Sequence, residues 1–350
     1  MTIRRATFVA LAVLAGGLVV TSVAASRLRA RSESPYRGYA AAEVFVDVAP
    51  GSPARAIARQ LVAVGVVRDA WAFRYVLWQT DRGRQLQAGE YRFDRPLSAR
   101  QVVEKLAAGD IHLRPITFPE GLTIWAMAEI FGTSGFGTAD EFLDASRKAD
   151  RIASLDPDAT DLEGYLFPDT YALPRTATAA DLVEAMVARF EQAFDEPLRR
   201  DVGDAGRTVR EIVTLASLIE RETALAEERA VVSAVYTNRL RIDMALQCDP
   251  TVIYALERAG LYEGNLTRDN LRYDSPYNTY VYPGLPPGPI AAPGRSALEA
   301  AVRPADAGYL YFVSRNDGSH VFASSLREHN RNVREYQIRY FREARGKGRS

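Results

Sequence analysis

An uncharged apolar segment near the amino terminus limits what this chain can fold into more than any other feature. Residues 6–26 read ATFVALAVLAGGLVVTSVAAS and contain no Asp, Glu, Lys or Arg. Since about 20 apolar residues span the hydrocarbon core of a bilayer as one helix, the segment predicts a transmembrane anchor. Arg4 and Arg5 favour a cytoplasmic tail of residues 1–5, although three arginines at the start of the following linker, 27–42, weaken that orientation.

The competing interpretation of this segment is a cleaved signal peptide. Val23-Ala24-Ala25 resembles the small-residue site at which such peptides are cut. The apolar run is longer than an ordinary signal core, so we favour the retained anchor. In both cases we expect most of the chain to leave the cytoplasm.

Composition and charge exclude several classes of protein. The 350 residues are 47% hydrophobic and 25% charged, which is ordinary for a globular protein, and the length indicates two domains. The formal net charge is zero, so we expect no nucleic-acid partner. Cys248 is the single cysteine, so no internal disulfide can form. His320 and His329 lack a metal-ligand spacing, so we expect no metal site and place both in loops or on the surface.

The sequence after the linker predicts a small module of mixed helix and strand at residues 43–112. Alternating valines from Val44 to Val48 indicate a strand. Ser52 and Ser98 each precede a helical pattern as candidate N-caps, and Gly109 ends the second of these helices. The expected elements are strands at 44–48 and 89–93 and helices at 53–64, 70–78 and 98–109.

Residues 113–345 are expected to form a larger mixed domain, so the fold class of the whole chain is α+β. Beyond Gln247 the sequence is rich in Pro and Gly, which predicts loops. The expected elements are strands at 116–118, 308–313 and 320–322 and helices at 121–130, 180–194 and 209–240.

The helix predicted at 209–240 contains LASLIERET, in which two carboxylates interrupt an apolar pattern. On a helical wheel with about 100° per residue, Glu222 falls about 70° from the centre of the apolar stripe, inside the apolar sector. Glu220 falls about 90° away on the other side, at the border of that sector. The opposite face, which carries Thr214 and Ser217, is expected to meet solvent.

A carboxylate in an apolar sector is costly unless it is paired or neutral, and burial raises its pKa. Glu222 is therefore either one partner of a buried ion pair, for instance with Arg239 or Arg241, or a general acid. The helix alone does not decide between these two interpretations. For Glu220 we favour a structural role.

The loops after this helix carry groups that suit a sugar. Gln247 and Asp249 follow the helix, and Asn278 and Thr279 lie among tyrosines at positions 273, 277, 280 and 282. Amides and carboxylates bind hydroxyl groups, and aromatic rings lie against sugar faces. Ordinary packing is the better interpretation for most of these tyrosines. The cluster nevertheless indicates a polar pocket with aromatic walls, which favours the general acid.

Several long segments resemble the endolytic murein transglycosylases, the YceG-like family. They are LASLIERET, NRLRIDMALQCDPTVIY at 238–254, SPYNTYVYPGLPPGPIAAPG at 275–294, YLYFVSRNDGSHVFASSLREHN at 309–330 and EGYLFPDTY at 163–171. The 43–112 module resembles the LysM-like subdomain of that family, and the resemblance runs from about residue 43 to about residue 340. Cys248 stands where other members often have another small residue, which we expect to be tolerated.

This resemblance implies a single-pass protein of the inner membrane, with its catalytic domain on the periplasmic side and close to peptidoglycan synthases. It implies internal cleavage of nascent peptidoglycan strands between N-acetylmuramic acid and N-acetylglucosamine. The product carries a 1,6-anhydro-muramyl end, and the cut terminates glycan elongation. The catalytic glutamate of the family is the second in its E-x-E pattern, which is Glu222, the residue that the wheel selects separately. No metal or organic cofactor is implied.

In the expected mechanism Glu222 first donates a proton to the glycosidic oxygen and then accepts one from the C6 hydroxyl of the muramyl sugar. The rival reaction is hydrolysis, for which Asp249 or Glu163 would supply a second carboxylate. A rival from another class is a noncatalytic wall-binding scaffold. The residues expected to bind substrate are Gln247, Asp249, Tyr277, Asn278 and Glu163.

Overall fold

A computed structural model describes the backbone of residues 2–340 and 342, with side chains from residue 15 onward. The chain divides into two compact units. The amino-terminal unit comprises Met1–Arg114 and Ala172–Thr176, and the carboxy-terminal unit comprises Pro115–Tyr171 and Ala177–Ser350. Residue 1 of the predicted tail and residues 341 and 343–345 of the predicted larger domain lie outside the described residues.

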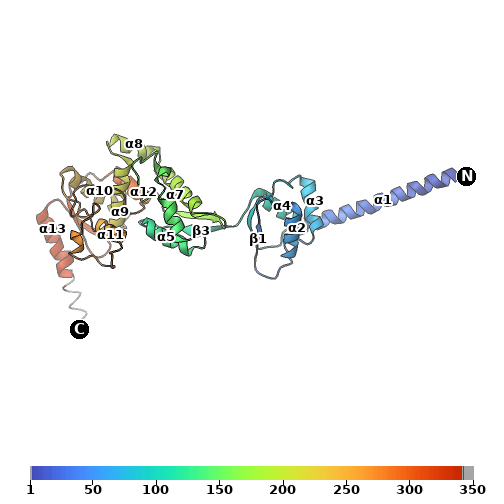
Figure 1. Cartoon of the computed structure of the whole chain (residues 1–350), viewed down its shortest axis with the longest axis horizontal. Coiled ribbons are helices and arrows are strands. Elements are labelled where there is room, and N and C mark those ends of the chain that lie inside the picture. The colour runs from blue at the N-terminus through green and yellow to red at the C-terminus, as the bar shows by residue number, and fades with distance from the viewer. Residues whose placement is uncertain (1, 341, 343–350) are drawn as a thin grey trace, which may run out of the picture. The chain divides into compact units, whose positions relative to one another are not determined.

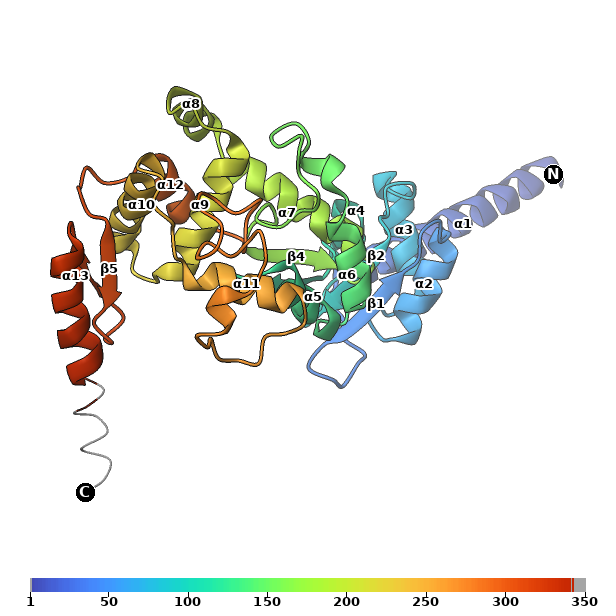
Figure 2. The same ribbon diagram turned by 60° about the vertical axis from the view of Figure 1, so that its left-hand side comes forward.

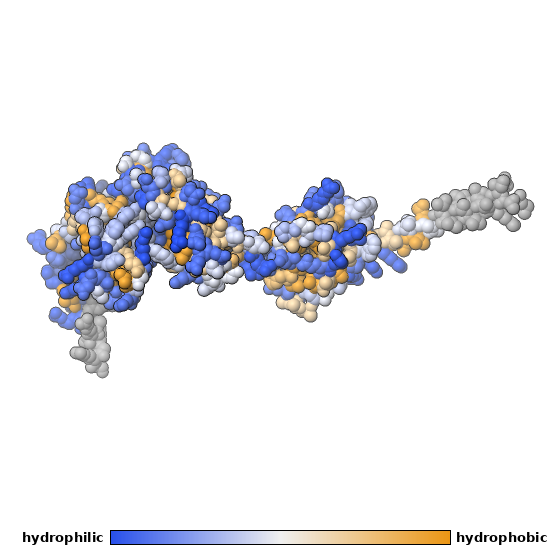
Figure 3. Space-filling view, in the orientation of Figure 1, coloured by the Kyte–Doolittle hydropathy of each residue, from blue (hydrophilic) through white to orange (hydrophobic). Residues whose placement is uncertain are grey.

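The first helix, α1 (Thr2–Glu33), contains the predicted membrane segment. Its described side chains include the exposed apolar residues Leu18, Val19, Val20 and Val23, in the part of the helix that Figure 3 colours by hydropathy. Among the helices with described side chains, none meets the length and apolarity required of a membrane span. The side chains of residues 6–14 lie outside that description, so the anchor at 6–26 stays a prediction.

The amino-terminal unit is built on two antiparallel strands, β1 (Val44–Val48) and β2 (Gly89–Phe93). Val46 pairs with Tyr91, and the inward side chains of the strands form a core with three helices. These are α2 (Ala54–Ala63), α3 (Ala70–Thr80) and α4 (Ala99–Ala108), which Figure 1 shows near β1. The predicted strands and helices are confirmed here. Ser98 caps α4, whereas Ser52 caps nothing, because Pro53 occupies the N-cap of α2.

The carboxy-terminal unit is mainly helical, and its described strands form two-stranded sheets. Strand β3 pairs with β4, and β5–β6 is an antiparallel hairpin. The predicted α+β class is confirmed. The elements are β3 (Leu113–Thr117), α5 (Ile124–Thr133), α6 (Ala139–Ser146), β4 (Thr170–Pro174), α7 (Ala179–Ala193), α8 (Glu196–Asp204), α9 (Val209–Glu222), α10 (Ala226–Arg241), α11 (Asp249–Arg258), α12 (Arg295–Val302), β5 (Tyr311–Ser314), β6 (His320–Ala323) and α13 (Leu326–Val333).

The single helix predicted at 209–240 is wrong, because the chain breaks at Thr223 into α9 and α10. Thr223 has extended backbone angles, φ −138° and ψ 133°. Its hydroxyl accepts a hydrogen bond from the Leu225 amide at 3.2 Å and donates one to Glu228 at 3.2 Å. A threonine hydroxyl that serves nearby groups in this way competes with the helical hydrogen-bond pattern. Glu222 consequently becomes the last residue of α9.

Helix α9 is buried on nearly all sides, which contradicts the predicted solvent face. Thr214 and Ser217 are 1% and 0% exposed. Helices α10, α11 and α12 pack around α9, as Figure 2 shows. The Ser217 hydroxyl accepts a hydrogen bond from the Ile290 amide at 3.0 Å, so the loop before α12 covers this side chain. Helices α11 and α12 themselves lie where the sequence predicted loops.

Candidate active site

Glu222 lies on the wall of a cavity of about 230 Å³ in the carboxy-terminal unit. The residue ends α9 and is half-buried. Polar and aromatic side chains from several elements share the wall. They are Arg239 of α10, Gln247 in the following loop, Asp249 of α11, Tyr280, Phe312 of β5 and His329 of α13, with Leu246 beside them.

Two neighbouring side chains contact the Glu222 carboxyl at the same oxygen, Oε2. The Tyr236 hydroxyl donates a hydrogen bond to Oε2 at 3.0 Å, and the Cys248 thiol contacts the same oxygen at 3.6 Å. Tyr236 and Cys248 are each 1% exposed. The carboxyl is therefore fixed by groups that are themselves fixed by packing.

The surroundings favour the protonated form of Glu222. Burial raises its pKa above the ordinary value, and the negative charge of Asp249 raises it further, while the Tyr236 hydrogen bond and His320 act in the opposite direction. Its place at the carboxyl end of a helix, where the helix dipole is negative, also disfavours a carboxylate. A carboxyl that holds its proton toward neutral pH and faces a cavity has the properties of a general acid.

Glu220, two residues earlier, has the environment of a structural residue. Its carboxylate accepts a hydrogen bond from Arg229 Nη2 at 2.9 Å and another from the Gly294 amide at 3.0 Å. The two charged side chains are 5% and 10% exposed. The buried ion pair that the sequence left open for Glu222 is thus made by Glu220, and with an arginine that the sequence did not single out.

Two of the predicted substrate residues lie beside Glu222. Gln247 has a left-handed backbone, φ 50°, and its backbone amide donates to the Thr279 carbonyl at 3.2 Å. The turn at this residue places it in the lining of the cavity. Asp249 begins α11 and accepts a hydrogen bond from the Tyr280 hydroxyl at 2.6 Å. Both residues therefore reach the cavity from the segment that joins α10 to α11.

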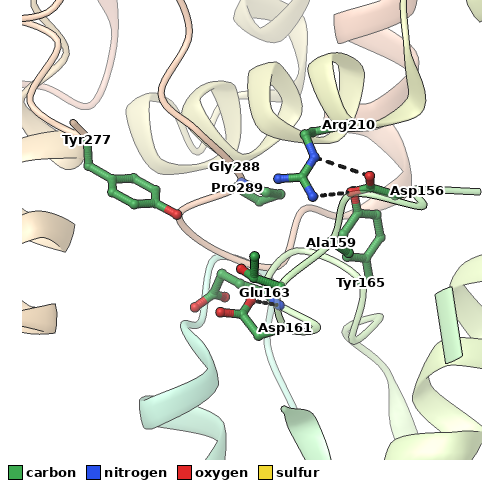
Figure 4. Close-up of a pocket in the computed structure, with 10 residues that line it drawn as sticks. Asp156, Ala159, Asp161, Glu163, Tyr165, Arg210, Tyr277, Gly288 and Pro289 are labelled. Carbon is green, nitrogen blue, oxygen red and sulfur yellow. Dashed lines mark hydrogen bonds and ion pairs between the residues drawn. The ribbon is translucent and has the colours of Figure 1, made fainter. Parts of the chain in front are cut away.

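The other three predicted substrate residues do not reach this cavity. Asn278 is fully buried, and its amide nitrogen donates to the carbonyls of Leu271 and Tyr273 at 3.1 and 2.8 Å, so it shapes the loop. Tyr277 and Glu163 line a different pocket, drawn in Figure 4. Their roles in binding substrate stay predictions.

The sequence missed several residues that build the cavity. His329, expected in a loop or at the surface, lies on α13 and stacks on Tyr311 with ring centroids 5.1 Å apart. Arg239 makes no ion pair with Glu222 but donates to the carbonyls of Leu310 and Leu246 at 2.6 and 2.7 Å. It thereby joins the β5 edge to the loop that carries Gln247.

Phe312 of the β5–β6 hairpin lines the cavity, and contacts between His320 and Glu228 of α10 hold the hairpin in place. His320, also expected in a loop or at the surface, lies on β6 with 11% of its side chain exposed. Its backbone amide and its Nδ1 approach Glu228 at 2.8 and 2.7 Å. The His320 ring meets Phe312, a cavity residue, edge to face at 5.4 Å.

Among the described residues, no group of three His, Cys, Asp or Glu could hold a metal ion.

The chain is similar to proteins of one family along most of its length. The sequence profile of the YceG-like family matches residues 46–335. A Bacillus subtilis (strain 168) protein named endolytic murein transglycosylase is 33% identical over 319 residues, which cover 84% of this chain and 84% of that protein. A protein of the same name from Streptococcus pneumoniae (serotype 2, strain D39) is 30% identical over 324 residues, which cover 84% of this chain and 58% of that protein.

A solved structure agrees with these sequence matches. The 2.6 Å crystal structure of a yceG-like protein from Listeria monocytogenes superposes with a TM-score of 0.57 at 29% identity. The match covers 83% of this chain and 98% of that one. This chain belongs to the YceG-like family.

Proposed function

We propose that this chain is a lytic transglycosylase that cuts peptidoglycan strands internally, between N-acetylmuramic acid and N-acetylglucosamine, and leaves a 1,6-anhydro-muramyl end. The observation that carries the proposal is Glu222, a carboxyl with a raised pKa on the wall of a polar cavity. The relatives named endolytic murein transglycosylases support peptidoglycan as the substrate.

The first step is proton transfer from Glu222 to the glycosidic oxygen, as the bond from that oxygen to the muramyl anomeric carbon breaks. Positive charge develops on the anomeric carbon. The Tyr236 hydroxyl and the Cys248 thiol stabilise the carboxylate that Glu222 becomes, because both hydrogen bonds favour the charged form. The negative charge of Asp249 lies in the same cavity and favours the developing positive charge.

In the second step Glu222 acts as a base. It accepts the proton of the muramyl C6 hydroxyl while that oxygen forms a bond to the anomeric carbon, which closes the anhydro ring. The proton that left Glu222 is replaced, and no water is consumed. One carboxyl thus serves both steps, and Gln247 supplies an amide to hold the substrate hydroxyls.

The proposal includes the place where the reaction occurs. Residues 6–26 anchor the chain in the cytoplasmic membrane, and the carboxy-terminal unit acts on the outer side, close to peptidoglycan synthases. The uncharged sequence of this segment and the exposed apolar side chains of α1 support the anchor. Residues 43–112 act as a LysM-like subdomain, and the cut ends the elongation of a nascent strand.

The second candidate is a glycoside hydrolase, which the position of Asp249 favours. Asp249 shares the cavity with Glu222, and a second carboxylate could activate water there. Glu163, the other carboxylate considered for this role, lines separate pockets.

Digestion of uncrosslinked strands in ¹⁸O-labelled water separates the two reactions. A transglycosylase yields anhydro-muramyl ends without the label, whereas a hydrolase yields reducing ends that carry it. Labelled reducing ends as the primary product would replace the transglycosylase proposal with hydrolysis through Asp249.

A further inference from the structure

A second cavity, of about 190 Å³, lies in the carboxy-terminal unit and shares no lining residue with the Glu222 cavity. Trp125 of α5, the loop residues Asp161 and Glu163, and Tyr254 and Arg258 of α11 line it. It adjoins the pocket of Figure 4, since Asp161 and Glu163 line both. The proposed mechanism uses none of these residues.

Glu163 gives this cavity a polar group that donates as well as accepts hydrogen bonds. The residue is 4% exposed, and its Oε2 accepts hydrogen bonds from the Ile124 amide at 3.2 Å and the Tyr254 hydroxyl at 3.4 Å. Burial raises its pKa to about 8, so the carboxyl keeps its proton at neutral pH. A neutral carboxyl suits the hydroxyl and amide groups of a sugar better than it suits an ion.

Aromatic side chains form the apolar part of the same site. The rings of Trp125 and Tyr254 lie 5.3 Å apart at 40°. Tyr254 also meets Tyr277, which lines the adjoining pocket, with ring centroids 4.9 Å apart. Arg258 lies over the Tyr277 ring and donates to its hydroxyl at 3.3 Å. Trp125 is partly exposed, so its ring is available to a ligand. Aromatic walls with a few placed polar groups are the chemistry that binds saccharides.

Helix α11 connects this cavity to the one that contains Glu222. Asp249, its first residue, lines the cleavage cavity, and Arg258, its last, lines the second one. The helix has 10 residues, so its ends are about 14 Å apart at a rise of about 1.5 Å per residue. A rigid helix holds the two cavities at a fixed spacing that a polymeric substrate can bridge.

We propose that this second cavity is a saccharide-binding site, with Trp125 as its platform, that holds sugar residues of the same glycan strand at a distance from the bond that Glu222 cleaves. This inference rests on the proposed function for the identity of the strand. Contacts made away from the reacting bond strengthen substrate and transition state equally, so they lower KM without changing kcat.

The kinetic test compares Trp125→Ala with the parent chain on peptidoglycan strands of graded length. We expect KM for long strands to rise about tenfold, the size of one lost aromatic contact, with kcat and the KM of the shortest cleaved strands unchanged. Trp125→Phe should restore most of the loss because it keeps a ring. An unchanged KM for long strands, in a parent that cleaves them, would overturn the inference and leave the proposed function standing.

A second experiment measures ligand binding to this cavity and does not depend on catalytic activity. Trp125 is the one tryptophan left when Trp71 and Trp78, both exposed, are replaced by phenylalanine in a Glu222→Gln full-length chain. Titration with tetra-N-acetylchitotetraose should change its fluorescence saturably. This result would support the saccharide site even if the parent proved inactive. A saturable change with free stem peptide, and none with the sugar, would make the cavity a peptide site and overturn the inference. No change with either ligand would also overturn it.

Discussion

Replacing Glu163 with glutamine should remove a large part of the pH dependence of stability in the carboxy-terminal unit. The folded protein holds the Glu163 proton up to a pKa of about 8, whereas the ordinary value for a glutamate is 4.5. Between these two values the folded state binds a proton that the unfolded state has released. The free energy of unfolding therefore falls as pH rises from 4.5 to 8, because unfolding is favoured by the loss of that proton.

The size of the effect follows from the two pKa values. One proton changes the free energy of unfolding by about 1.36 kcal/mol per pH unit, so the full range from 4.5 to about 8 corresponds to roughly 5 kcal/mol. Burial also raises the pKa values of Glu220 and Glu222. Those residues are present in both proteins, so their contributions cancel when the Glu163→Gln variant is compared with the parent.

The assay is urea unfolding at several pH values between 5 and 8, followed by the fluorescence of Trp125. Trp125 contacts Tyr254, the hydrogen-bond partner of Glu163, and becomes the sole reporter when Trp71 and Trp78 are changed to phenylalanine. We expect the free energy of unfolding of the Glu163→Gln variant to rise, relative to that of the parent, by about 1.4 kcal/mol for each unit by which pH increases. Parallel stability curves for the two proteins would refute the reasoning that burial keeps Glu163 protonated.

Three further substitutions test the arrangement around the two helical glutamates. Tyr236→Phe removes a hydrogen bond that favours the charged form, so the pKa of Glu222 should rise and the alkaline limb of the kcat/KM profile should move to higher pH. Asp249→Asn removes a negative charge that favours the protonated form, so the same limb should move to lower pH; movement in the same direction as for Tyr236→Phe would contradict the assignment. Arg229→Met should lower the free energy of unfolding by about 3–5 kcal/mol, measured in urea, because it leaves Glu220 buried and unpaired. Combining it with Glu220→Gln should recover much of that loss, and no recovery would refute the pairing.

The features that could be predicted from the sequence are those set by nearby residues. Helix α4 has its limits marked by a capping box between Ser98 and Gln101 and by Gly109, whose φ of 67° suits glycine. The strand β1 follows from alternating valines. Glu222 could be singled out because a helical wheel uses only the positions of residues within one helix. Helix α9 includes every residue up to Glu222, so the wheel holds there.

The features that could not be predicted depend on segments far apart in the chain. Ser217 is buried because the loop before α12 donates to its hydroxyl, some 70 residues later. Tyr236 reaches Glu222 only because the chain turns back at Thr223, where one hydroxyl bonds to two groups outside α9. Its tyrosine-rich surroundings in the sequence predict Asn278 as a substrate residue, but its amide donates to two loop carbonyls, which no pattern of residue types reveals.

In the proposed mechanism Glu222 is both the acid and the base of a transglycosylation. The most direct test is mass spectrometry of uncrosslinked peptidoglycan strands treated with the full-length chain, its Glu222→Gln variant and a matched Glu227→Gln control, exposed in the first turn of α10. We expect anhydro-ended fragments from the parent and the control. We expect the rate of the Glu222→Gln variant to be lower by about a thousandfold or more, with the native circular dichroism spectrum retained. Full activity of the Glu222→Gln variant, or reducing ends from the parent, would contradict this mechanism.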